Sequence, residues 1–245
     1  MSDRAHFLDQ RRGGLGGTDV AAIMGTHPHT GPWEVWLSKV HGFDQPGGED
    51  AAIGQWLERP IAEWAAAELG AELAIGAPLV GDPAWMRASP DFWLHTSGPP
   101  TGLEVKCTDQ WSPDQVQWYM LVADRPVWLV AEYVPRFWRR TIHTIEADPE
   151  RQRELRSTAA TWWQRHVVEG VPPEVDGSDA CRDWLGSQSP TARDEIRAAT
   201  DDEEALARDV HAAEQAAKSL EAEAARACNR LRASMGDVRR VYFTG

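Results

Sequence analysis

The sequence of 245 residues has no long apolar run, no excess of basic residues and no regular cysteine pattern. No stretch reaches the roughly 18 apolar residues that a membrane-spanning helix needs, and the first residues lack the apolar core of a secretory signal. The three cysteines, Cys107, Cys181 and Cys228, are odd in number and far apart, unlike a zinc-binding pattern or a disulfide framework. We therefore expect a cytoplasmic protein.

The charge balance is acidic, with 25 basic and 38 acidic residues and a net charge of −13. This argues against a protein that binds nucleic acid through a wide basic face. It does not exclude a DNA enzyme with a small local groove, because carboxylates that hold a divalent cation reverse the sign of the local charge. What is abundant is tryptophan, with thirteen residues. Most are expected to fill the core, and a few could stack on bases.

The first 70 residues are expected to be mainly helical. Residues 15–25, LGGTDVAAIMG, predict a glycine-rich turn and a short helix whose N-cap is Thr18 or Asp19. Residues 32–42 place three apolar side chains at helical spacing, and residues 51–70 predict a long helix.

Strand patterns follow. Residues 71–106 consist of short apolar segments separated by glycine and proline, and we expect them to be strands of one sheet. Residues 114–124 return to helical spacing. Residues 125–134 predict a buried strand, with 137–147 paired beside it, and 149–169 predict another helix. The fold class is therefore α/β.

The last third has a different composition. Residues 171–180 predict a linker, and residues 190–235, rich in Ala, Glu and Arg, predict either one amphipathic helix or a helical hairpin. The segment VRRVYF could add a terminal strand. We expect a core domain over residues 1–175 and a C-terminal helical extension over 176–245.

Two motifs, ASPD and GLEVK, suggest chemistry. Asp91 follows Pro90, whose fixed φ favours a sharp turn. Glu104 and Lys106 are two residues apart, so on a strand their side chains share a face. Carboxylate oxygens suit a hard divalent cation, and the carbonyl of Val105 is a further oxygen donor. The ammonium group of Lys106 could act on a water molecule or on a phosphoryl oxygen.

Each feature alone has an ordinary explanation. An acid and a lysine two apart on a strand usually form a solvated face, and an aspartate after proline is usually a turn residue. Glu58, in GQWLERP, could present a second carboxylate from a helix, although alone it would be a surface residue. The combination in this order favours a site.

The chain resembles the YqaJ-type viral recombinase family, relatives of phage lambda exonuclease within the PD-(D/E)XK nucleases. The matching segments are RRGGLGGTDVAAIMG, IGQWLERPIAEW, ASPD, GLEVK and QVQWYM. The resemblance implies a central mixed sheet flanked by helices. It also implies Mg²⁺-dependent hydrolysis of phosphodiester bonds, with Mn²⁺ as a substitute, typically 5′ to 3′ on duplex DNA ends.

The resemblance assigns roles to residues. Asp91, Glu104 and the carbonyl of Val105 match the metal ligands, and Lys106 matches the lysine that positions or activates the attacking water. Glu58 matches a helix acid that acts on the metal directly or through water.

Further positions match more loosely. Gln115 and Tyr119 match a Q-x-x-x-Y element, with Gln117 beside it. Arg11 and Thr18 fall where relatives hold the 5′-terminal phosphate, and Ser89 is a further candidate there. A guanidinium suits phosphate, and a helix start favours an anion.

The sequence departs from the family at two points: Phe92 and Trp93 follow ASPD, where relatives usually have glycine, and the chain is acidic throughout. Two alternatives to a recombination exonuclease stay open, namely an endonuclease of a restriction or defence system and a non-catalytic DNA-binding or assembly protein. Expected partners are duplex DNA ends, further copies of the chain (the family includes trimeric rings) and a single-strand annealing protein.

Overall fold

The computed structural model describes residues 12–43, 48–188 and 197–236. The chain divides into two compact units, Met1–Pro190 and Thr191–Gly245. The first unit therefore extends beyond residue 175, where the sequence placed the domain boundary. It includes helix α7 (Asp179–Ser187) because the ring of Trp184 packs against Trp33 and Trp36, with ring centroids 5.3 Å apart in each case.

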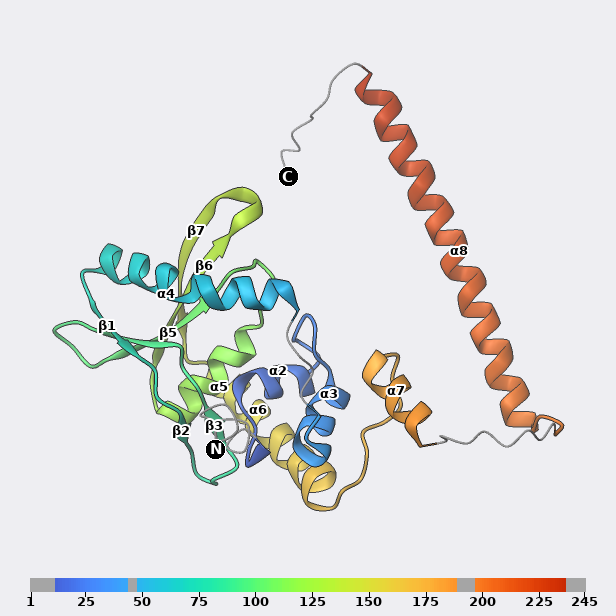
Figure 1. Ribbon diagram of the computed structural model, residues 1–245, viewed down its shortest axis with the longest axis horizontal. Helices are drawn as coiled ribbons and strands as arrows, with labels where there is room; N and C mark the ends of the chain where they lie inside the picture. Colours follow the sequence, from blue (N-terminus) through green and yellow to red (C-terminus); the bar gives the residue numbers. More distant parts are fainter. Residues whose placement is uncertain (1–11, 44–47, 189–196, 237–245) are drawn as a thin grey trace. The chain divides into compact units, whose positions relative to one another are not determined.

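The first unit is built on a five-stranded sheet of order β1-β4-β5-β6-β7 (Figure 1). Its strands are β1 (Glu72–Ile75), β4 (Phe92–His95), β5 (Thr101–Lys106), β6 (Val127–Val134) and β7 (Arg139–Glu146). Strands β5 and β6 are parallel and the other neighbours are antiparallel. Helices lie on both faces, so the predicted mixed sheet flanked by helices is confirmed.

Two of the predicted strands lie outside this sheet. Strands β2 (Leu79–Val80) and β3 (Arg87–Ala88) pair only with each other in a two-stranded sheet, so the prediction of a single sheet over residues 71–106 was wrong. Their hairpin is held instead by Leu15, whose amide donates to the Trp85 carbonyl at 2.7 Å and whose carbonyl accepts from Arg87 at 2.9 Å. These contacts bring the glycine-rich N-terminal segment beside the segment that precedes Asp91.

Helix α4 (Glu49–Leu69) covers one face of the large sheet (Figure 1). Its buried residues recur at helical spacing and pack on apolar residues of β4, β5 and β6. They are Ile61, Ala62, Ala65 and Ala66. Pro60 lies inside the helix without ending it. It is exposed, and on that side water can bond to the carbonyl that a proline leaves without an intrahelical partner.

The opposite face carries α2 (Gly17–Ile23), α5 (Pro113–Ala123) and α6 (Pro149–Trp162), which continues into the π-helix η3 (Trp163–Val168). Helix α3 (Pro32–Trp36) continues into the π-helix η1 (Leu37–His41) and ends at Gly42, whose φ is +69°. The core on this side is rich in tryptophan. This confirms the prediction that several of the thirteen tryptophans fill the interior. The largest fully buried side chains are Trp33, Trp36, Trp118 and Trp128.

The second unit contains helix α8 (Asp201–Met235), a single helix of 35 residues. The alternative of a helical hairpin over this segment was therefore wrong. The helix begins with a capping box, in which Thr200 and Glu203 each bond the backbone amide of the other. The segment VRRVYF lies outside the described residues. No helix in the described ranges is long and apolar enough to cross a membrane.

Gly102 gives a test of the core. In the parallel register it pairs with Trp128, and a Cβ at this position would lie 2.2 Å from the buried indole ring. We expect Gly102→Ala to lower the free energy of unfolding by about 1–3 kcal/mol through overpacking, measured by urea denaturation.

The matched control is Gly54→Ala in α4, where a Cβ meets no atom within 4 Å. Because glycine weakens a helix interior, this change should stabilise the protein by about 0.5–1 kcal/mol. Equal unfolding midpoints for Gly102→Ala and the wild type would contradict the packing.

Candidate active site

The register of β4 and β5 brings the two sequence motifs together. Phe92 pairs with Leu103, so continuation of the antiparallel pairing by one residue places Asp91 opposite Glu104. The Asp91 carboxylate accepts a hydrogen bond from the Val105 amide at 2.8 Å. The twelve intervening residues are β4, a turn and the start of β5. The acid after the proline turn therefore lies beside the strand acid.

Glu104 joins β5 to α5 at the site. Its side chain is buried, and its Oε1 accepts from Lys106 Nζ at 2.8 Å and from Gln115 Nε2 at 2.7 Å. Its Oε2 is buried and has no hydrogen-bond partner in the described part of the chain. One oxygen of the carboxylate is thus fixed by the protein, and the other remains available to a ligand.

Helix α5 supplies the residues that hold this carboxylate. Gln115 accepts from Lys106 Nζ at 2.9 Å, and its amide nitrogen also donates to the Tyr119 hydroxyl at 3.0 Å. Gln115 and Tyr119 are four residues apart and therefore share a helix face, as predicted. Burial raises the pKa of Tyr119 well above its usual value, and the charge of Glu104 adds to this effect. The phenol therefore stays protonated.

The start of α5 is anchored by a polar network that sequence analysis missed. Ser112 caps the helix, and its hydroxyl lies 2.7 Å from that of Thr26, which also donates to Asp114 at 2.7 Å. Asp114 in turn accepts from Arg151 of α6 at 2.6 and 2.8 Å. These bonds position the first turn of α5, and hence Gln115. A second tie is the bond from Trp118 Nε1 to the carbonyl of Arg87, at 2.8 Å.

A cavity of about 350 Å³ opens over these groups. Its lining combines the N-terminal glycine-rich segment, α4, the segment before β4, the end of β5 and α5. The predicted residues in this lining are Thr18, Glu58, Ser89, Asp91, Glu104, Val105, Lys106, Gln115 and Tyr119. Three predicted features that are distant in sequence, the ASPD turn, the GLEVK strand and the α5 face, therefore meet at one place.

The carboxyl groups in this cavity repel one another. The pKa of Asp91 is raised to about 8, first by burial and then by the charge of Glu104. The pKa of Glu58 is also raised, by burial and by Glu104. Glu58 lines the cavity from α4. Without a cation the site therefore favours the protonated form of Asp91, and a bound cation would favour the ionised carboxylates.

The part of the cavity rim formed by the start of α2, residues 16–19, differs from prediction in one respect. The N-cap of α2 is Gly16, not Thr18 or Asp19. Asp19 is the third residue of the helix and accepts from the Gly16 amide at 2.8 Å, and Lys39 Nζ lies 2.7 Å from the same carboxylate oxygen. The helix start is thus already occupied by a carboxylate. Gly17 is required here because a Cβ would lie 2.7 Å from the Gln115 carbonyl and the Tyr119 ring.

Two other predicted residues are not brought to the cavity. Gln117 faces the opposite side of α5, where its amide nitrogen donates to the Glu146 carbonyl at 2.8 Å and its oxygen accepts from the Asp148 amide at 2.9 Å. Its role is to join α5 to the β7–α6 connection, which corrects its assignment to the DNA-binding set. Arg11 lies outside the described residues. The lining does contain Arg87, which sequence analysis missed and whose buried Nε has no hydrogen-bond partner among the residues that the structure describes.

Residues 6–126 match the family model of the YqaJ-like viral recombinase domain. This segment is similar to the YqaJ-like viral recombinase domain. The predicted resemblance is therefore confirmed, and all the cavity residues named above lie within the matched segment.

Two further comparisons concern one sequence relative and the fold. The chain is similar to the uncharacterised protein YqaJ of Bacillus subtilis, with 25% identity over 204 residues that cover 74% of this chain. The match spans 62% of the length of YqaJ. The fold is similar to that of LHK-Exo, described as an alkaline exonuclease from Laribacter hongkongensis. Its two crystal structures, one with dAMP, each give a TM-score of 0.56 at 16% identity over 76% of this chain and 98% of theirs.

The donor set fits a small divalent cation. Among the described residues, no three His, Cys, Asp or Glu side chains form a metal-binding group. Mg²⁺, however, commonly uses one or two carboxylates and keeps several waters. Asp91, the unpartnered Oε2 of Glu104 and the carbonyl of Val105 provide oxygens of that kind. The repulsion between the carboxyl groups is the cost that such an ion would remove.

The stability of the metal-free protein should report this repulsion. The pKa of Asp91 is about 8 in the folded chain and about 3.9 in an unfolded one. The folded state therefore binds the proton more tightly between pH 4 and 8, so stability falls as pH rises through this window. Asp91→Asn keeps an acceptor for the Val105 amide but removes the titration. We expect the variant to be more stable than the wild type at pH 8 by at least about 1 kcal/mol.

The measurement is urea denaturation in EDTA at several pH values. The two proteins should have similar unfolding midpoints near pH 4 and diverge as pH rises. If the midpoints of the two proteins differed by the same amount at every pH, the raised pKa would not belong to Asp91.

Proposed function

We propose that this chain is a Mg²⁺-dependent deoxyribonuclease that hydrolyses phosphodiester bonds at duplex DNA ends, 5′ to 3′, in phage-type recombination. The observation that carries the proposal is the cluster of Asp91, Glu104 and Lys106. Gln115 bonds Glu104 and Lys106, and the Val105 amide bonds Asp91. The YqaJ-like domain and the similarity in fold to an alkaline exonuclease support it.

The proposed cation would be held by Asp91, Glu104 and the carbonyl of Val105, with Glu58 acting through water. When bound, it would supply positive charge to a phosphodiester and lower the pKa of a coordinated water, and Mn²⁺ would substitute for Mg²⁺. The same donors would not distinguish sharply between these two ions, since both prefer oxygen ligands.

Lys106 has the chemistry to hold the attacking water or a phosphoryl oxygen. An ammonium group has three hydrogen-bond donors. Lys106 uses two of them in its bonds to Glu104 and Gln115. The third has no partner in the part of the chain that the structure describes. Gln115 fixes the direction of the ammonium group, because its oxygen accepts from Lys106 while its nitrogen donates to Glu104 and Tyr119.

The 5′-terminal phosphate would be held at the rim by Arg11, Thr18 and Ser89. The Asp19 carboxylate at the start of α2 would disfavour a phosphate at the helix amides, so the Thr18 hydroxyl would be the donor there. Arg87 joins this set, since it lines the cavity and its Nε has no partner among the described residues.

The other proposed partners are further copies of the chain, in a trimeric ring for example, and a single-strand annealing protein. One or the other would contact the apolar stripe of α8, whose members Leu206, Val210 and Leu220 are exposed.

Substrate topology tests the proposal against its main alternative. Linear duplex DNA should be digested with Mg²⁺ and remain intact with EDTA, whereas a closed circle should survive in both. Cleavage of the circle would indicate an endonuclease, and no Mg²⁺-dependent digestion of either substrate would indicate a non-catalytic protein.

Lys106→Ala is the test of the catalytic assignment. We expect cleavage of linear duplex to fall by about 10²–10⁴-fold, the usual contribution of a group that handles a proton or developing charge. Binding of the same duplex in EDTA should change little. The control is Arg153→Ala, which alters an exposed arginine of α6 and should leave the rate unchanged. Wild-type cleavage by Lys106→Ala would remove Lys106 from the mechanism.

The rim assignment makes a separate prediction. Loss of a charge-assisted hydrogen bond to phosphate costs about 1.5–3 kcal/mol, so Arg11→Ala and Arg87→Ala should each reduce the preference for a 5′-phosphate over a 5′-hydroxyl end by about tenfold or more. The measurement is the ratio of initial rates on two duplexes that differ only in this group. Equal losses on both duplexes would place these arginines elsewhere on the DNA.

A further inference from the structure

The tip of the β6–β7 hairpin, residues 135–140, exposes aromatic rings and arginines together. Its sequence is PRFWRR, without an acidic residue. Trp138 is 84% exposed and Phe137 is 56% exposed. Trp138 also has a φ of +52°, a left-handed conformation that a bulky side chain adopts only at a cost. Neither core packing nor backbone preference explains a tryptophan at this position, which indicates a contact outside the chain.

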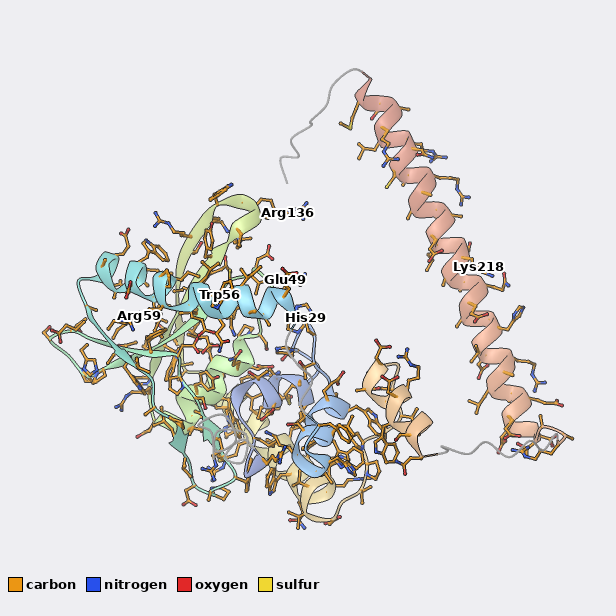
Figure 2. All side chains as sticks on the ribbon, viewed as in Figure 1. His29, Glu49, Trp56, Arg59, Arg136 and Lys218 are labelled. Carbon is orange, nitrogen blue, oxygen red and sulfur yellow. The ribbon has the colours of Figure 1, made fainter. Side chains whose placement is uncertain are left out.

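The charge of the hairpin tip is opposite to that of the protein. Its three arginines lie in a chain of net charge −13. Arg139 bonds the buried Glu132 at 3.1 Å, and the guanidinium of Arg136 lies over the Phe137 ring, 5.4 Å from its centroid. Arg136 has no ion pair with any described residue, and Figure 2 places it at the outer end of the hairpin. A polyanion would complement this surface.

The hairpin tip lies beyond the end of β5 that carries the active site. Strands β5 and β6 are parallel, and Lys106 pairs with Glu132. Strand β6 then continues to Val134, roughly 7 Å further along its direction, before the turn Pro135–Phe137 (Figure 1). The tip is therefore on the order of 10 Å beyond Lys106, which corresponds to about three nucleotide steps at 3.4 Å each. DNA in the cavity could reach it.

We propose that the hairpin tip binds the unpaired DNA strand next to the site, with Trp138 and Phe137 stacked on bases and Arg136 on a phosphate. The inference rests on the proposed nuclease function, since it requires DNA in the cavity. Unpaired DNA is the partner because flat rings stack on bases whose faces are accessible, and a duplex hides those faces. In a duplex-end nuclease, the strand that is not hydrolysed becomes unpaired as digestion proceeds.

The experiment compares Trp138→Leu with Trp138→Phe in the full chain. Binding of a fluorescent single-stranded oligonucleotide and of a blunt duplex is measured by anisotropy in EDTA. Loss of one stacked base should weaken single-strand binding by roughly 5- to 150-fold in the leucine variant. The phenylalanine variant should retain most of the affinity, and duplex binding should change little in either. In Arg136→Ala, the logarithm of the single-strand affinity should fall less steeply with the logarithm of the salt concentration, by about 0.7 in the magnitude of the slope.

Arg153→Ala, an exposed arginine of α6, is the control for a general loss of charge and should preserve the salt slope. Single-strand affinity that is the same for tryptophan, phenylalanine and leucine at position 138 would overturn the proposal. Equal losses on single strand and duplex would also overturn it, since they would indicate a backbone contact. Because the assay involves no cleavage, a chain without nuclease activity would still give a result for the hairpin tip.

Discussion

The hydrogen bonds that converge on Oε1 of Glu104 are the interactions on which the site depends. One carboxylate oxygen accepts from both Lys106 and Gln115, so β5 and α5 are fixed relative to each other at the point where chemistry is proposed. The other oxygen is left without a partner among the described residues, beside Asp91. A buried carboxylate that is half satisfied is unfavourable for folding alone. The arrangement is understandable if a ligand completes it.

The acidic character of the chain limits how the proposed site could bind DNA. A protein with net charge −13 has little general attraction for DNA. In the proposed function, DNA binding would therefore come from local groups, namely a cation among the carboxylates, the rim residues and the arginines of the hairpin tip. Specific contacts at few points suit an enzyme that acts on DNA ends more than a protein that coats DNA.

The sequence predicted the strand and helix that carry the site because their patterns are local. Glu104 and Lys106 share a strand face, and Gln115 and Tyr119 share a helix face. Gln117 was misplaced because it is two residues from Gln115 on the same helix and therefore lies on the opposite face, where it bonds the Glu146 carbonyl. Arg87 and the network of Thr26, Asp114 and Arg151 were missed because only tertiary packing brings them to the site. The separate β2–β3 hairpin was missed for a similar reason, since its position depends on a distant partner, Leu15.

The bond between Trp118 and the Arg87 carbonyl has a consequence for how a substrate would advance. It ties the segment leading to Ser89 to the same helix that carries Gln115. If Ser89 holds a chain end as proposed, it would do so from a segment that is bonded to the helix carrying Gln115, the residue that contacts Lys106. Each proposed cut would then fall at a constant distance from the captured terminus, and the products would be released as mononucleotides.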